Sequence, residues 1–155
     1  MPKVKAINTD LSKETIIYLA GLFDGEGMVA INEQNNKRGK TISPCWQYRV
    51  EIANTDWRIM QFLLTNIGGT VSKKSSTRSH WRQGYDWTLT GENADAFCKM
   101  IRPFTIIKSD QIDACLYFRQ RFARTNKKQT DAEIAAKRMM VETIKMMKRS
   151  DYAPC

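Results

Sequence analysis

The sequence has very few of the residues that hold structural zinc. His80 is the only histidine, and the four cysteines, Cys45, Cys98, Cys115 and Cys155, form no CxxC pair. Structural zinc sites need four Cys or His ligands, usually supplied as closely spaced pairs. We therefore expect no zinc site, and free, mostly buried thiols in a reducing compartment.

The sequence also lacks long apolar segments. No run approaches the roughly 18 apolar residues of a membrane-spanning helix, and the first residues, MPKVKAINTDLSKE, contain no signal-peptide core. We therefore expect an intracellular protein that does not associate with membranes. Hydrophobic residues make up 42% of the chain, which excludes a disordered chain, and its 155 residues fit one domain, residues 1–155.

The charge balance is strongly basic. The chain has 25 Lys and Arg against 16 Asp and Glu, for a formal net charge of +9. A basic domain of this size has an electrostatic field suited to a polyanion, and nucleic acid is the usual one. Composition favours a nucleic-acid partner over the alternative of a basic surface that only keeps the protein in solution.

Hydrophobic periodicity predicts an α+β fold with two hairpins. Residues 45–53, CWQYRVEIA, alternate between apolar and polar side chains, as in a half-buried strand. Glycines 25 and 27 are expected to end the first helix. The expected order is α-β-β-α-β-β-α-α-α: helix 12–24, strands 28–34 and 45–53, helix 55–67, a second hairpin over 70–91, and helices 92–101, 109–124 and 131–148.

One short segment, LAGLFDGEG at residues 19–27, combines small residues with acids. Gly21 and Gly25 share one helix face, which would suit either packing within the chain or a helix–helix dimer contact. Asp24 and Glu26 fall at the negative end of the helix dipole, where a carboxylate is disfavoured unless a cation compensates. They either close a turn or, when two helix ends meet on a two-fold axis, form a divalent-cation site.

LAGLFDGEG closely resembles the LAGLIDADG motif that names a family of homing endonucleases. Two supporting segments, IANTD at 52–56 and RPFTIIKSDQ at 102–111, resemble family segments at matching distances. The resemblance implies an αββαββα core over about residues 12–122 with a saddle-like antiparallel sheet. A basic, helical C-terminal extension over about residues 123–155 would follow it. The organelle or other intron-bearing compartment in which such proteins act is not fixed by the sequence.

The resemblance also implies roles for residues around the motif. Glu26 matches the family acid that binds the catalytic divalent metals, and Gly25 would offer its backbone carbonyl to a metal. Asp24 matches the residue that caps the partner helix. Lys108 matches a basic residue that helps polarise the scissile phosphate or organise the nucleophilic water.

Two further positions match the family more weakly. Asn54 falls where members often carry a glutamine that positions water, so the amide is kept on a shorter side chain. Arg58, one helical turn further on, resembles an active-site basic residue.

The motif occurs once in the chain, which implies a homodimer in this family. The interface would consist of the motif helices, through Leu19, Ala20, Gly21, Asp24 and Gly25. Each protomer would supply one Glu26, and the two composite sites would produce a double-strand break with 3′ overhangs. The implied metal is Mg²⁺, with Mn²⁺ as an expected substitute and Ca²⁺ supporting binding without cleavage.

The hairpins are expected to read double-stranded DNA in the major groove, where each base pair shows a distinct pattern of donors and acceptors. The candidates for base reading are Asn32, Gln34, Gln47, Arg49, Glu51, Ser72, Lys74, Asp86 and Thr88. The candidates for phosphate contacts, which set register, are Lys37, Arg38, Lys40, Lys73, Arg78 and Arg82. The basic residues Arg119, Arg121, Arg124, Lys127 and Lys128 either add backbone contacts or keep the protein soluble.

The sequence thus supports a Mg²⁺-dependent, site-specific DNA endonuclease acting as a homodimer. The main alternative is an RNA-binding maturase that assists splicing of its host intron, with or without retained cleavage, since some relatives do so. A third hypothesis is a non-catalytic DNA-binding module. Glu26 and Lys108 favour the endonuclease.

Overall fold

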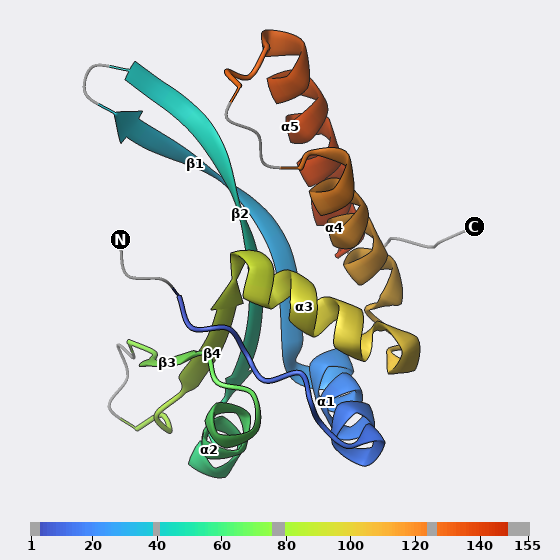
Figure 1. The fold of residues 1–155 in the computed structure, drawn as a ribbon. Coiled ribbons are helices and arrows are strands. Elements are labelled where there is room, and N and C mark those ends of the chain that lie inside the picture. The colour runs from blue at the N-terminus through green and yellow to red at the C-terminus, as the bar shows by residue number, and fades with distance from the viewer. Residues whose placement is uncertain (1–3, 39–40, 76–79, 124–126, 149–155) are drawn as a thin grey trace.

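The computed structural model describes residues 4–38, 41–75, 80–123 and 127–148 and confirms the predicted α+β order (Figure 1). A short 3₁₀ helix, η1, is the one addition to that order among the described residues. The elements are α1 (Lys13–Glu26), β1 (Gly27–Arg38), β2 (Thr41–Asn54), α2 (Trp57–Asn66), β3 (Thr70–Lys73), β4 (Tyr85–Thr90), α3 (Gly91–Ile101), η1 (Arg102–Phe104), α4 (Ser109–Arg121) and α5 (Asp131–Met146).

The strands form one antiparallel sheet in the order β1-β2-β4-β3. Val29 lies opposite Val50, which in turn lies opposite Leu89, and all three are buried. Because side chains alternate along a strand, this register sends the intervening polar residues to the other face. Helices α3, α4 and α5 lie on one side of the sheet, and the opposite side of β1 and β2 carries no helix (Figure 1).

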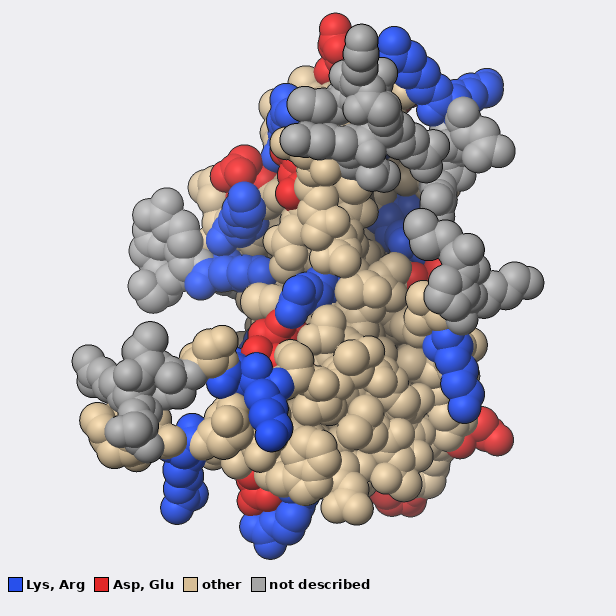
Figure 2. Space-filling model, turned by 90° about the vertical axis from the view of Figure 1, so that its left-hand side faces the viewer, with Lys and Arg blue, Asp and Glu red and all other residues tan. Residues whose placement is uncertain are grey.

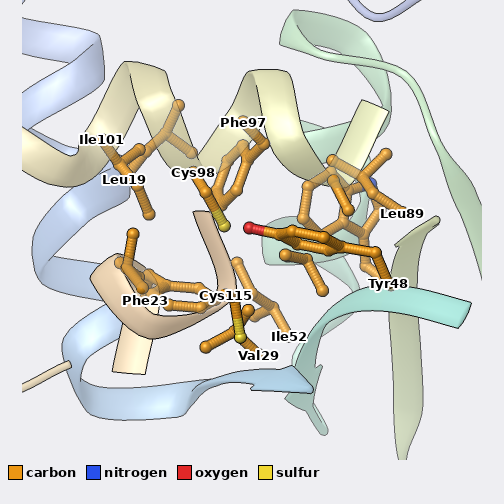
Figure 3. Close-up of a cluster of buried hydrophobic side chains, with 14 of the residues drawn as sticks. Leu19, Phe23, Val29, Tyr48, Ile52, Leu89, Phe97, Cys98, Ile101 and Cys115 are labelled. Carbon is orange, nitrogen blue, oxygen red and sulfur yellow. The ribbon is translucent and has the colours of Figure 1, made fainter. Parts of the chain in front are cut away.

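The core lies between the sheet and the helices. Phe23 of α1, Trp87 of β4 and Phe97 of α3 are fully buried, with Phe97 in edge-to-face contact with both other rings. The Tyr48 hydroxyl points toward the sulfur of Cys98 (Figure 3). Burial raises the pKa of the Cys98 thiol to about 12, so it stays protonated at neutral pH.

The remaining described cysteines, Cys45 and Cys115, are free, as is Cys98, so the expectation of free thiols is confirmed for these three. Cys155 lies outside the described residues. No helix in the described part of the chain has the length and apolar character to cross a membrane.

The ends of several elements differ from the sequence-based prediction; β2, for example, begins at Thr41 rather than at residue 45. Helix α1 continues through Gly25 to Glu26, and only Gly27 leaves the helical conformation. Strand β1 extends to Arg38, where a loop over 35–40 was expected, because its backbone stays paired with β2 as far as Arg38 opposite Thr41. Further along, Gly68 and Gly69 end α2 as predicted, at positive φ angles of 108° and 90° that glycine adopts readily.

Helix α5 supports the outer part of the β1–β2 hairpin. The Arg138 guanidinium donates to the Glu33 carboxylate of β1, with an Nη2–Oε1 distance of 2.7 Å. The Lys137 ammonium lies 4.9 Å from the centre of the Trp46 ring, and Gln129 donates to the Pro44 carbonyl. Beyond the core, α5 is therefore the element that holds this hairpin on its covered side.

Candidate functional site

The C-terminal end of α1 brings an acid to the surface at the start of the sheet. Glu26 is exposed and is the last helical residue, and no basic residue lies in the last turn of α1. Gly27 follows it against the Phe23 ring, where an added Cβ would overlap a ring carbon. Glycine at this position therefore lets β1 begin directly beneath the helix end, with Glu26 projecting from the junction.

Asp24 fixes a loop from the far part of the chain against this helix end. Its Oδ2 accepts from the Ile106 amide at 2.8 Å, and its Oδ1 accepts from the Lys108 amide at 3.0 Å. Both carboxylate oxygens thus have partners within the same chain. The role in capping a partner helix, implied by the family resemblance, stays a prediction.

Lys108 is held at the same helix end. Its Nζ donates to the Asp24 carbonyl at 2.6 Å and lies 5.9 Å from the centre of the Phe23 ring. Partial burial lowers the pKa of Lys108 below its ordinary value, while the charges of Asp24 and Glu26 act in the opposite direction. The structure therefore gathers a cation and an exposed carboxylate around the carbonyl end of α1.

Asn54 lies at this end as well. It is the last residue of β2, two residues beyond Ile52, which is opposite Gly27. Its Oδ1 accepts from the Asp56 amide at 2.8 Å in a tight turn that starts α2. That turn does not use its amide nitrogen, which has two N–H donors.

Arg58 lies elsewhere. Its side chain is 88% exposed and pairs with Asp56 at 2.8 Å, and this guanidinium lowers the pKa of Asp56 to about 2. It borders an open apolar pocket together with Glu14 and Thr15 of the first turn of α1. Glu14 is separated from Glu26 by about 18 Å of helix at 1.5 Å per residue. The structure thus brings Lys108 near Glu26, places the end of β2 with Asn54 at the same end of α1, and places Arg58 at the other end.

One face of α1 carries two glycines for which no close contact within the described chain gives a reason. Gly21 and Gly25 are exposed, and an added Cβ at either position would meet nothing within 4 Å. Ile17 beside them is 45% exposed. Packing within the chain, one of the two interpretations of this spacing, therefore does not account for these glycines.

Leu19 and Ala20, which the resemblance placed at the dimer interface, are fully buried in the core of their own chain. Because neither side chain reaches the surface, the exposed part of the motif helix includes Gly21 and Gly25, together with Ile17 and Tyr18 just before the motif. Among the described residues, no group of three or more His, Cys, Asp or Glu side chains could hold a metal within one chain.

The open face of the sheet carries the predicted polar side chains. The strand register places eight candidates for base reading on it, and the ion pair with Asp86 places Lys74 there as well; the eight are Asn32, Gln34, Gln47, Arg49, Glu51, Ser72, Asp86 and Thr88. Several contact one another: Gln34 donates to Gln47 at 3.1 Å, Arg49 pairs with Glu51 at 2.6 Å, and Lys74 pairs with Asp86 at 3.2 Å. Figure 2 shows the side of the molecule that faces left in Figure 1, where Lys and Arg side chains are spread out and acidic side chains lie beside some of them.

The candidates for phosphate contacts lie around the edges. Lys73 is exposed on the edge strand β3, and Arg82 is exposed between β3 and β4. Lys40 and Arg78 lie outside the described residues, and of Lys37 and Arg38 only the backbone is described. Of the basic C-terminal candidates, Arg121, Lys127 and Lys128 are exposed, Arg119 is partly buried, and Arg124 lies outside the described residues.

Sequence reasoning missed the support that α5 gives to the hairpin. The signal was Glu33, which follows Val29 and Ile31 on the face of β1 that turns toward the helices. An acid at that position in an apolar alternation indicates a basic partner on the covered side.

Comparisons with known proteins match both the motif and the fold. A family model described as LAGLIDADG endonuclease matches residues 19–117. No curated protein matches the chain in sequence. The fold is similar to that of the homing endonuclease I-CvuI in complex with the I-CreI target, with a TM-score of 0.66 at 15% identity over 92% of this chain and 87% of that one.

Two further structures show the same likeness. The archaeal intron-encoded homing endonuclease I-Vdi141I, complexed with DNA, gives a TM-score of 0.70 at 11% identity over 92% of this chain and 89% of that one. The I-LtrWI LAGLIDADG homing endonuclease, bound to target DNA, gives 0.66 at 15% identity over 99% of this chain and 49% of that one. The chain thus corresponds to most of some of these enzymes and to about half of another.

Proposed function

Because the chain belongs to the LAGLIDADG endonuclease family, whose model matches residues 19–117, we propose that it is a site-specific DNA endonuclease acting as a homodimer. It hydrolyses phosphodiester bonds with Mg²⁺ and makes double-strand breaks with 3′ overhangs in a long target site. The observation that carries this proposal is the open glycine face of α1, which ends at the exposed carboxylate of Glu26.

The dimer forms through that face. Gly21 and Gly25 let two helix backbones approach closely, and Ile17 supplies apolar surface beside them. A two-fold axis puts the same residues of both copies in contact and brings two helix ends together. Each end carries one Glu26, so the pair of chains supplies the carboxylates that a single chain lacks.

The donors at the helix end suit Mg²⁺. Glu26 and the backbone carbonyl of Gly25 are hard oxygen donors, and Mg²⁺ commonly binds through one or two carboxylates together with water and substrate phosphates. When bound, Mg²⁺ supplies a more acidic water and stabilisation of the charge on the leaving oxygen. Mn²⁺ is expected to substitute, and Ca²⁺ to support binding without cleavage.

The neighbouring residues orient the reacting groups. Lys108, held by the Asp24 carbonyl, places a positive charge near the scissile phosphate. Asn54 directs its amide N–H groups to the water, because its carbonyl oxygen is already used in the turn.

The substrate lies along the open face of the sheet. Its polar side chains face the major groove, and the basic residues at its edges contact phosphates. A net charge of +9 favours association with duplex DNA, with an affinity that falls as salt rises.

The test is incubation of the whole protein with a randomised duplex library and Mg²⁺, followed by sequencing of cut ends. We expect double-strand breaks at one long site. Glu26→Gln should still bind that site in Ca²⁺ but cut it about 100-fold more slowly or worse, since metal catalysis contributes several kcal/mol. Glu92→Gln, which changes an exposed acid in the first turn of α3, is the matched control.

A second variant tests the dimer. Gly21→Leu has room in its own chain and favours the helix, so the monomer should fold normally. The dimer, measured by light scattering at micromolar concentration, should dissociate and cleavage should be lost. Cutting by Glu26→Gln at a rate near that of wild type, or cutting by a Gly21→Leu monomer, would contradict the mechanism. Binding of structured RNA in preference to any duplex would favour the maturase.

A further inference from the structure

The Arg49–Glu51 ion pair lies at the centre of the open face. Both residues are on β2, two positions apart, so their side chains leave the same face of the strand. Strands β1 and β4 flank β2, with Ala30 opposite Arg49 and Thr88 opposite Glu51. Neither side chain is at a sheet edge, where contacts with phosphates would be expected.

The geometry of the pair leaves one edge of the guanidinium available. The Nε and Nη2 atoms of Arg49 both donate to Oε2 of Glu51, at 3.2 and 2.6 Å. A guanidinium has five N–H donors. The side edge is therefore occupied, while one hydrogen of Nη1 and the second hydrogen of Nη2 remain on the end of the fork. That end has the spacing of the O6 and N7 acceptors of guanine in the major groove.

The two side chains differ in depth. The Glu51 side chain is 18% exposed and that of Arg49 is 35% exposed. Glu51 is thus the less accessible of the two to a base. Both were candidates for base reading from the sequence, and this arrangement separates their roles.

We propose that Arg49 reads a guanine in the target and that Glu51 is the positioning residue that orients it. The inference rests on the proposed function, since it needs DNA along the open face. The pair acts as one specificity-determining unit: Glu51 restricts the rotation of a long side chain before DNA binds, which reduces the entropy lost on binding.

The register also predicts where that guanine lies. Arg49 precedes Asn54, the end of β2 beside Glu26, by five residues, or about 17 Å of strand. At about 3.4 Å per base pair, the guanine lies about five base pairs from the cleaved region in each half-site. Two-fold symmetry places a cytosine at the matching position of the other half-site on the same strand.

The test is selection of bound duplexes from a randomised library in Ca²⁺, with wild type, Arg49→Ala, Glu51→Ala and the double variant. Wild type should prefer guanine by about 10- to 100-fold at one position per half-site, the value of a good bidentate contact. Arg49→Ala should abolish that preference and leave the other positions unchanged. Glu51→Ala should weaken the same preference several-fold, and should have no further effect when Arg49 is already alanine.

A matched control is available on α3, away from this face. Asp95 is 15% exposed and pairs with Lys99 at 2.8 Å, so Asp95→Asn weakens an ion pair whose acid is equally shielded. It should leave the selected site unchanged. Thermal unfolding of each variant shows whether a lost base preference is caused by loss of the fold or by loss of the contact with the base.

Three results would overturn the inference. If Glu51→Ala loses a preference for cytosine at another position of the selected site, Glu51 reads a base itself. An Arg49→Ala variant that weakens binding equally for all sequences would make Arg49 a phosphate contact. Both results leave the endonuclease intact, whereas a wild-type protein that selects no duplex overturns the proposed function and this inference with it.

Discussion

The two hairpins of the sheet are held in place in different ways. The strands of the first, β1 and β2, have 12 and 14 residues, and those of the second, β3 and β4, have 4 and 6. The second hairpin packs on the core through Trp87, whose indole N–H donates to the Gly68 carbonyl at 2.7 Å. The first extends past the core, and its outer part lies against α5.

The tryptophan of the first hairpin makes the contrast specific. Trp46 is only partly buried, its Nε1 atom is buried without an acceptor among the described residues, and its ring contacts the Lys137 ammonium. One hairpin is thus fixed by a buried ring with a satisfied hydrogen bond. The other is fixed by charged side chains of a helix added at its surface. Breaking the first support should destabilise the whole domain, while breaking the second should affect mainly the surface proposed to read DNA.

The largest expected difference is in the free energy of unfolding, when the same Trp-to-Phe substitution is made in each of the two hairpins. Trp87→Phe removes a buried hydrogen bond, leaves the Gly68 carbonyl unpaired and opens a cavity, so we expect a loss of about 2–4 kcal/mol in the free energy of unfolding. Trp46→Phe removes an unpaired N–H and keeps a ring for Lys137. We expect it to stay within about 1 kcal/mol of wild type. Urea denaturation measures both, and equal losses would contradict the comparison.

A smaller effect is expected from breaking the support of the first hairpin. Glu33→Ala and Arg138→Ala remove the same ion pair but change the net charge in opposite directions. Because the pair is exposed to solvent, which screens the interaction, each should change the stability only slightly. If α5 holds the reading surface in place, both should weaken binding of the target duplex, by about two- to fivefold in titrations at fixed salt.

The opposite charge changes serve as each other's control. Simple electrostatic attraction to DNA would make Glu33→Ala bind more tightly and Arg138→Ala more weakly. Opposite shifts would therefore show that α5 acts through charge alone. Shifts in the same direction would support positioning of the hairpin.

The order of the elements could be predicted because each carries a local signal. Strand alternation, the glycines at 68 and 69 and the apolar spacing of the helices are all visible within a few residues. The extension of β1 was missed because Asn35 and Asn36 have no strand-like pattern of their own. They are in a strand because the backbone of β2 pairs with them, opposite Pro44 and Ser43.

The candidate site was predictable only where a motif specified it. The resemblance pointed to Glu26 and Lys108, which the structure brings to one helix end. It could not supply the hydrogen bonds of Asp24 to the backbone of Ile106 and Lys108, because they join positions more than 80 residues apart. Nor could spacing reveal that Arg58 is held by Asp56 at the opposite end of α1.

The smallest expected effect concerns the protonation of Glu33. The hydrogen bonds and charge of Arg138 lower the pKa of this carboxyl below its ordinary value. A carboxyl with a lowered pKa in the folded state contributes stability above its unfolded pKa and loses that contribution as pH falls through the folded value. The support of the first hairpin should therefore weaken only in acid, below the ordinary pKa of a glutamate.

NMR titration of the Glu33 carboxyl measures this pKa directly. Arg138→Ala should raise the pKa toward its ordinary value, and amide shifts around Trp46 should follow the same titration. Amide shifts around Trp87 should not follow it, because that ring is held by a hydrogen bond to the Gly68 carbonyl and by contact with the Phe97 ring. A common midpoint in both hairpins would show that the two supports are not independent.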